Sequence, residues 1–154
     1  MKGVILAILM PVLFVAVCSA QGTARKVNNV KPKKEMRTEH LTKADFMRKV
    51  ADLQSNPTQW KYLGDKPAII DFYADWCAPC RTLAPILEEL AAEYGDRLHV
   101  YKINVDNEQE LAAMFGIRSI PSLLFIPMEG KPRMTQGVMS RSELEAAIKK
   151  LISK

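Results

Sequence analysis

The stretch IDFYADWCAPC, residues 70–80, determines how the rest of this chain can be interpreted. Its first four positions are mostly apolar or aromatic, a pattern typical of a buried strand, and its last four form a Cys-x-x-Cys motif. Pro79 suits the first turn of a helix, because the N–H that proline lacks would have no helical partner there. We therefore predict a strand that runs into a turn and then into a helix beginning at the cysteines.

The spacing of Cys77 and Cys80 favours redox chemistry. A thiol at a helix N-terminus lies near the positive end of the helix dipole and beside unpaired backbone N–H groups. Both stabilise the thiolate, which is the form that attacks disulfides. The two intervening residues let the second thiol close a ring, so the pair can cycle between dithiol and disulfide. The alternatives are a structural disulfide or half of a zinc site. A zinc site needs about four ligands, but there is no second cysteine pair, and His40 and His99 lie far away in the sequence.

The same stretch resembles the signature of the thioredoxin family, in which Trp-Cys-x-x-Cys follows a buried strand. The resemblance covers roughly residues 45–152. It implies the α/β thioredoxin fold, a mixed central β-sheet flanked by helices on both faces. It also implies a thiol–disulfide oxidoreductase that needs no cofactor beyond a redox-active disulfide between Cys77 and Cys80. Ala78 replaces the glycine of most thioredoxins, which we expect to shift the reduction potential. Tyr73 replaces a tryptophan found in many members, which leaves the redox chemistry untouched.

The resemblance assigns catalytic roles to four residues. Cys77, at the helix tip, matches the exposed nucleophile, and Cys80, one turn inside, matches the resolving thiol that attacks the mixed disulfide. Asp71 lies in an apolar strand, where desolvation raises the pKa of a carboxyl toward neutrality. In the family this aspartate accepts the proton of the buried cysteine, and Lys102 occupies the place of the lysine that pairs with it. A structural buried ion pair between Asp71 and Lys102 is the alternative, and both interpretations can hold together.

A second part of the predicted site lies around Ile120 and Pro121, where the family has a cis-proline that faces the cysteines. A cis bond occurs almost only before proline. It would direct the Ile120 backbone outward, where an extended substrate segment can add as a short strand. A trans proline is the alternative, and Ser119 replaces the family's frequent glycine. Trp76 either contributes to an apolar rim around the thiols or is a packing residue. The residues expected to bind substrate are Trp76, Ala78, Pro79, Ile120, Pro121, Gly137 and Val138.

Periodicity and capping signals predict the remaining elements. Strands are expected at residues 68–73, 99–104, 123–126 and 133–138, the last two forming a hairpin, and helices at 41–53, 79–94, 108–115 and from 140 onward. Thr42 and Ser140 each open a capping pattern that marks a helix start. Pro85 should kink the second helix because it removes one backbone hydrogen bond, and Gly95 should end that helix.

The N-terminus has the layout of a secretory signal. Lys2 precedes an apolar run, Val4–Val17, which is shorter than the ~20 residues that a membrane-spanning helix needs. Small residues follow, so we expect a signal peptide at residues 1–20 that is cleaved after Ala20. An uncleaved membrane anchor and a lipoprotein signal with Cys18 lipidated are the alternatives. Residues 21–40 are polar and basic and are expected to form a flexible arm, with the thioredoxin-like domain at 41–154.

The charge distribution argues against nucleic-acid binding. The chain of 154 residues has a net charge of +5, of which residues 21–40 contribute +4. Residues 41–154 carry 15 basic and 15 acidic side chains, so the predicted domain is neutral. Because a nucleic-acid-binding protein needs a basic face on its fold, no nucleic-acid partner is expected.

Together these observations predict an exported, monomeric oxidoreductase in the periplasm, or attached to a membrane through Cys18. It would reduce disulfides of partner proteins and receive electrons from a membrane protein outside the cytoplasm. The sequence does not fix the direction of electron flow, so a thiol oxidase or isomerase of the same fold remains open. So does a binding or assembly module whose thiols are incidental.

Overall fold

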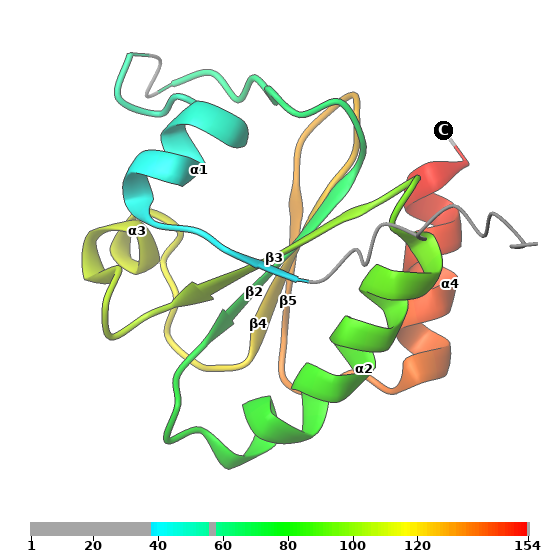
Figure 1. The fold of residues 1–154 in the computed structure, drawn as a ribbon. Helices are drawn as coiled ribbons and strands as arrows, with labels where there is room; N and C mark the ends of the chain where they lie inside the picture. The colour runs from blue at the N-terminus through cyan, green and yellow to red at the C-terminus, as the bar shows by residue number, and fades with distance from the viewer. Residues whose placement is uncertain (1–37, 56–57, 154) are drawn as a thin grey trace, which may run out of the picture. The chain divides into compact units, whose positions relative to one another are not determined.

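The strand predicted at residues 68–73 lies in the middle of a sheet in the computed structural model, which describes residues 38–55 and 58–153 (Figure 1). The strands are β1 (Glu39–His40), β2 (Ala68–Tyr73), β3 (His99–Asn104), β4 (Ser122–Ile126) and β5 (Arg133–Gln136). The helices are α1 (Lys43–Lys49), α2 (Ala78–Tyr94), α3 (Gln109–Met114) and α4 (Arg141–Ile152). Over this part of the chain, the five strands form one sheet in the order β1-β3-β2-β4-β5.

The sheet is mixed, and its register places the candidate residues. β3 is parallel to both β1 and β2, whereas β4 is antiparallel to both β2 and β5. Asp71 on β2 is paired with Lys102 on β3 and with Leu123 on β4. Because side chains alternate between the two faces of a strand and paired residues project to the same face, Asp71 and Lys102 leave the sheet on one side.

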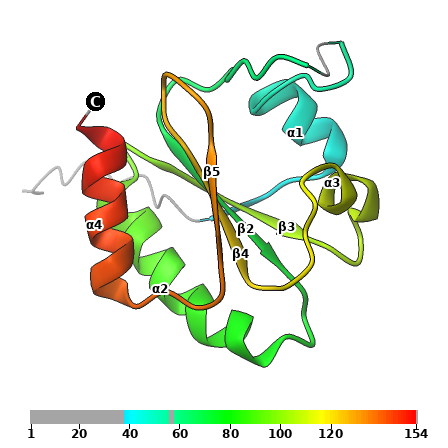
Figure 2. The same ribbon diagram turned by 180° about the vertical axis from the view of Figure 1, so that it is seen from behind.

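Helices cover both faces of the sheet, with α1 and α3 on one face and α2 and α4 on the other (Figures 1 and 2). Strand β2 contributes to a separate core on each face. Completely buried residues of the α1–α3 core include Phe46, Ile70, Phe72 and Leu111. Completely buried residues of the α2–α4 core include Ile69, Leu83, Leu87 and Leu144. The predicted fold class, a mixed sheet with helices on both faces, is therefore confirmed.

The helix starts follow the local signals in the sequence. The hydroxyls of Thr42 and Ser140 cap α1 and α4, and the side chain three residues later returns the bond in each capping box. Helix α2 begins immediately after Cys77, and it contains Pro85. Gly95 caps the end of α2, but with a right-handed backbone, at φ −53°. The left-handed conformation that makes glycine favourable at helix ends is therefore not used there.

Several predicted boundaries were wrong. The first helix ends at Lys49 rather than residue 53, because the N–H groups of both Val50 and Ala51 converge on the Phe46 carbonyl and the helical pattern stops. Residues 39–40, assigned to the arm, instead form β1. The last strand ends at Gln136 rather than residue 138, because Gly137 turns the backbone to φ 89°, outside the extended region.

The predicted signal peptide and residues 21–37 of the predicted arm lie outside the described residues. Among the helices that are described, none combines the length and the apolar character needed to cross a membrane.

Candidate active site

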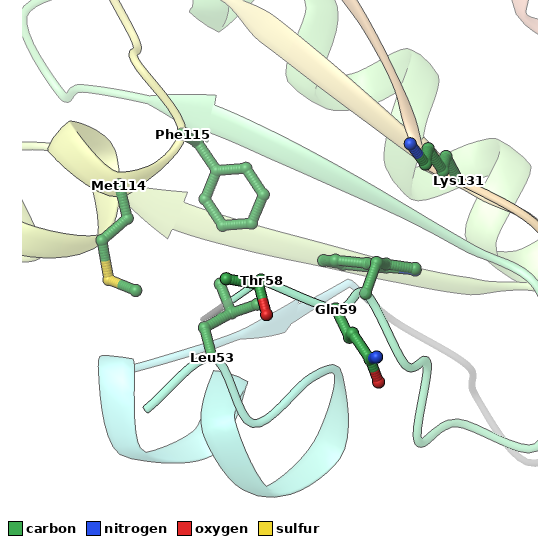
Figure 3. Close-up of a pocket in the computed structure, with 7 residues that line it drawn as sticks. Leu53, Thr58, Gln59, Met114, Phe115 and Lys131 are labelled. Carbon is green, nitrogen blue, oxygen red and sulfur yellow. The ribbon is translucent and has the colours of Figure 1, made fainter. Parts of the chain in front are cut away.

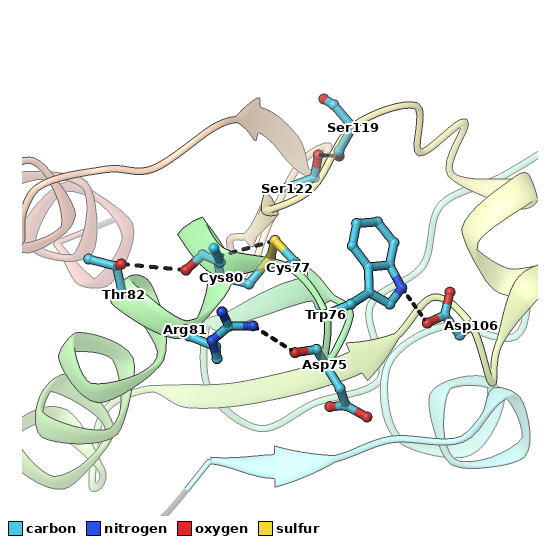
Figure 4. Close-up of a disulfide and its surroundings, with 10 residues drawn as sticks. Asp75, Trp76, Cys77, Cys80, Arg81, Thr82, Asp106, Ser119 and Ser122 are labelled. Carbon is cyan, nitrogen blue, oxygen red and sulfur yellow. Dashed lines mark hydrogen bonds between the residues drawn. A yellow bond between two sulfur atoms is a disulfide. The ribbon is translucent and has the colours of Figure 1, made fainter.

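Cys77 and Cys80 form a disulfide at the N-terminus of α2, with an S–S distance of 2.07 Å and a Cα–Cα distance of 5.3 Å (Figure 4). Cys77 is the N-cap residue of the helix, with an extended backbone. Its Sγ accepts the backbone N–H of Cys80 at an N···S distance of 3.2 Å. A hydrogen bond to the charged form of an acid favours that form, so after reduction this N–H would stabilise a thiolate on Cys77.

Exposure does not distinguish the two cysteines in the disulfide form. Cys77 is 3% exposed and Cys80 is 2% exposed, so the expectation that Cys77 is the exposed sulfur does not describe this state. Both cysteines pack with Ala74, and the side chains of Tyr73 and Ile120 lie against the same small cluster. What separates the two is their place on the helix. Cys77 caps it and Cys80 lies within its first turn.

The loop before β4 faces this cluster through Ile120. The Ile120-Pro121 peptide bond is cis, as the resemblance implied. The Pro121 carbonyl accepts the N–H of Gly137 at 2.8 Å, and the Ser119 carbonyl accepts the hydroxyl of Ser122 at 2.7 Å. The first bond connects the proline loop to the segment that follows β5, where Val138 is 49% exposed, and the second closes the loop on itself.

Trp76 projects from the surface just before the cysteines and is 68% exposed, which contradicts the alternative that it is a core packing residue. Its indole N–H donates to the Asp106 carboxylate at 2.8 Å (Figure 4). The Arg81 guanidinium donates to the Asp75 carbonyl at 3.1 Å, which connects α2 to the loop that carries Trp76. The ring is therefore held in place while most of its surface stays in water.

Asp71 is an acidic group without hydrogen-bond partners. The residue is completely buried, and neither carboxylate oxygen has a partner among the described residues. Burial raises the pKa of Asp71 from 3.8 to about 6, and the nearby positive charge of Lys102 limits that rise. A carboxyl with such a pKa can exchange protons close to neutral pH.

Lys102 is the strand neighbour of Asp71, as expected, but its ammonium group is directed to another partner. The Lys102 Nζ lies 4.6 Å from the centre of the Tyr73 ring, in a cation–π contact. The hydroxyl of Tyr73 lies 3.2 Å from Nδ1 of His40 on β1. The family resemblance therefore placed Lys102 correctly beside Asp71, but the contact of Lys102 with Tyr73 was not predicted. Strand alternation, which places residues 71, 73 and 102 on one face, was the available signal.

The other histidine lies in a separate surface contact. Nε2 of His99 lies 2.7 Å from the Asp65 carboxylate, and its ring stacks on Tyr101. Throughout residues 38–55 and 58–153, no cluster of three or more histidine, cysteine or acidic side chains could hold a metal ion.

A shallow hollow of about 410 Å³ contains none of the predicted site residues (Figure 3). It lies between the segment after α1 and the end of α3. Its lining residues are Leu53, Thr58, Gln59, Trp60, Met114, Phe115 and Lys131.

Comparison with known proteins places this site among the thioredoxins. The sequence model of the thioredoxin family matches residues 37–150. The chain is 44% identical over 109 residues to a thioredoxin from Borreliella burgdorferi, which covers 71% of this chain and 92% of that protein. It is 34% identical to the chloroplastic thioredoxin M-type of Spinacia oleracea, over 71% of this chain and 61% of that protein.

Two solved structures are similar to this one. Chloroplastic thioredoxin z has a TM-score of 0.63 at 26% identity, covering 77% of this chain and 96% of that one. The thioredoxin of Malassezia sympodialis has a TM-score of 0.60 at 28% identity, covering 75% of this chain and 90% of that one.

Proposed function

This chain belongs to the thioredoxin family and is a thiol–disulfide oxidoreductase that reduces protein disulfides, and on that basis we propose that Cys77 starts each turnover and that Cys80 completes it. The observation that carries this assignment is the hydrogen bond from the Cys80 backbone N–H to the Cys77 sulfur. It singles out Cys77 as the sulfur whose negative charge is stabilised at the helix N-terminus.

The proposed reaction begins with the reduced protein. The Cys77 thiolate attacks one sulfur of a partner disulfide, and the partner's other sulfur leaves as a thiolate and takes up a proton. Cys80 then gives its proton to Asp71, and the new thiolate attacks Sγ of Cys77. The bond between Cys77 and the partner breaks as the Cys77–Cys80 disulfide forms. The partner's second sulfur leaves as a thiolate that takes up a proton from water, and Asp71 releases its proton to water. Two electrons have passed to the partner, and no cofactor beyond this cysteine pair takes part.

Asp71 is proposed as the proton acceptor because its carboxylate is buried and has no competing hydrogen-bond donor. A pKa of about 6 leaves most of the carboxylate ionised at neutral pH and still basic enough to take a proton. Lys102 is proposed to moderate this pKa through its charge rather than through a direct ion pair.

The substrate is proposed to bind across the surface around the disulfide. Trp76 and Val138 supply exposed apolar area on this surface, and the segment at Ile120 and Pro121 offers backbone groups to an extended peptide. The complete proposed surface consists of Trp76, Ala78, Pro79, Ile120, Pro121, Gly137 and Val138.

The protein is further proposed to act as a monomer outside the cytoplasm. The support is the signal-like sequence of residues 1–20, with the periplasm as the proposed compartment and lipidation at Cys18 as the alternative attachment. A reductase in that compartment needs an electron donor, which we propose is a membrane protein carrying a dithiol.

Two cysteine variants test the order of attack. Cys77→Ser should abolish insulin disulfide reduction, because no thiolate starts the reaction. Cys80→Ser should instead accumulate a covalent adduct with a disulfide substrate, visible by mass spectrometry and released by a small thiol. If Cys77→Ser forms the adduct and Cys80→Ser does not, the two roles are reversed.

The reduction potential tests the direction of electron flow. A reductant should equilibrate with glutathione at a potential near about −270 mV, whereas an oxidant would lie near about −120 mV. Because the proposal is a reductase, a value at the oxidising end would overturn it. Loss of the signal segment should leave this potential unchanged while retaining the protein in the cytoplasm.

A further inference from the structure

Tyr73 contacts the ammonium group of Lys102, the residue that is paired with Asp71 on the neighbouring strand. All three residues lie on the α2 face of the sheet, with Asp71 paired directly to Lys102 and Tyr73 two positions further along β2. An ammonium group within about 6 Å of an aromatic ring centre is attracted to the face of that ring. The 4.6 Å separation between the Lys102 Nζ and the Tyr73 ring centre satisfies this condition.

The Tyr73 ring is held from two sides. Its hydroxyl lies 3.2 Å from Nδ1 of His40, whose ring contacts the tyrosine edge-on at an interplanar angle of 72°. His40 reaches this position because β1 pairs it with Lys102 across the sheet. Tyr73 also packs against the cluster that contains both cysteines. The ring therefore connects the lysine to the disulfide.

We propose that Tyr73 is a positioning residue that holds the Lys102 ammonium on its ring and so keeps the Asp71 carboxylate free of an ion pair. This inference deepens the proposed function, because it rests on Asp71 being the proton acceptor for Cys80. An ion-paired carboxylate would be a weaker base, since an opposite charge within about 4–6 Å favours the ionised form. A buried carboxylate without an ion pair keeps its affinity for the proton, because burial disfavours its charged form.

Lys102 is the charged group that acts on the pKa of Asp71. Lys102 is the charge that lowers the pKa of Asp71, β4 places the apolar Leu123 beside it, and the cysteines of α2 are joined as a disulfide. The titratable groups around the tyrosine are Asp71, Asp75, His40 and Lys102.

The test is the titration of the Asp71 carboxyl carbon by NMR in the oxidised protein. In Tyr73→Leu, which removes the ring, the midpoint should fall by about one pH unit or more as the released ammonium approaches the carboxylate. Tyr73→Phe keeps the ring and loses only the hydroxyl, so its midpoint should stay close to that of the wild type. An unchanged midpoint in Tyr73→Leu overturns the proposal, and so does an equal fall in both variants.

Water entering beside Asp71 could also lower the midpoint when the ring is removed, and a double variant separates the two causes. If the lysine is responsible, adding Lys102→Met to Tyr73→Leu should abolish the fall. A fall that persists in the double variant overturns the proposal.

A wild-type measurement keeps the proposal testable if Tyr73→Leu does not fold. The ring current of Tyr73 should shift the NMR signals of the Lys102 ε-methylene protons upfield. Signals at ordinary chemical shifts would contradict the contact between Lys102 and the ring. All these measurements use the disulfide form, so they do not depend on catalysis.

A separate experiment tests the proposed function of Asp71 as proton acceptor. That function is overturned if Asp71→Asn resolves mixed disulfides as fast as the wild type.

Discussion

Replacing Asp71 with asparagine should stabilise the folded protein at neutral pH and have much less effect in acid. Burial raises the pKa of this carboxyl from 3.8 to about 6, a rise of about two units. Each unit corresponds to about 1.36 kcal/mol, so the ionised Asp71 costs the folded state roughly 3 kcal/mol. Asparagine has nearly the same shape and carries no charge at any pH.

The sign of the pH dependence follows from proton binding. Between pH 3.8 and about 6 the folded state keeps a proton that the unfolded chain has released, so stability falls as the pH rises through this range. Below this range both states are protonated and the cost is absent; above it the cost is complete. The gain from Asp71→Asn should therefore be roughly 3 kcal/mol larger at about pH 7.5 than at about pH 3.5.

Urea unfolding of the oxidised protein at these two pH values measures the difference. The cost of burying an uncharged amide is similar at both, so it cancels in the comparison. The slope of the unfolding free energy against urea should match between variant and wild type, which shows that the same surface is exposed. Asp96→Asn is the matched control, because Asp96 is an exposed carboxylate and its replacement should show no such gain. If Asp71→Asn changes stability equally at both pH values, the reasoning about this buried carboxyl is wrong.

Three further predictions concern the surface and the backbone. Trp76→Ala should raise KM for insulin in steady-state reduction assays more than it lowers kcat, because most of the exposed ring is proposed to contact partner proteins. Gly137→Ala should cost about 1 kcal/mol in urea unfolding, because the left-handed backbone at φ 89° is strained for alanine although open space surrounds the new methyl group. Ser140→Ala should also cost about 1 kcal/mol, seen as a lower Tm in calorimetry, because the first turn of α4 loses its cap.

The elements with strong local signals were predictable from the sequence. The apolar run before the cysteines gave β2 with correct ends, and the capping patterns at Thr42 and Ser140 gave the starts of two helices. β1 was missed because it has only two residues, both exposed, and so carries no periodicity. Its position depends on pairing with β3, which is more than 50 residues away in the sequence.

The candidate site was predictable in its positions but less so in its contacts. The family resemblance brought Asp71 and Lys102 together, and the register confirms that they are neighbours. Whether a flexible lysine turns to a carboxylate or to a ring depends on side-chain conformation, which no sequence pattern encodes. The bond between Trp76 and Asp106 joins residues 30 positions apart, and it likewise leaves no local signal.

The two residues of β1 have a consequence for where this domain can be cut. Their pairing with Tyr101 and Lys102 shields the outer margin of β3, and the hydroxyl and N–H of Thr38 fasten the incoming chain to Glu88 on α2. In a truncated protein that starts at Leu41, β3 would become an exposed edge strand. A second molecule can pair with the free backbone groups of such a strand. A version of the domain that begins at or before Thr38 keeps these contacts, whereas one that begins at Leu41 is expected to self-associate even with its redox centre intact.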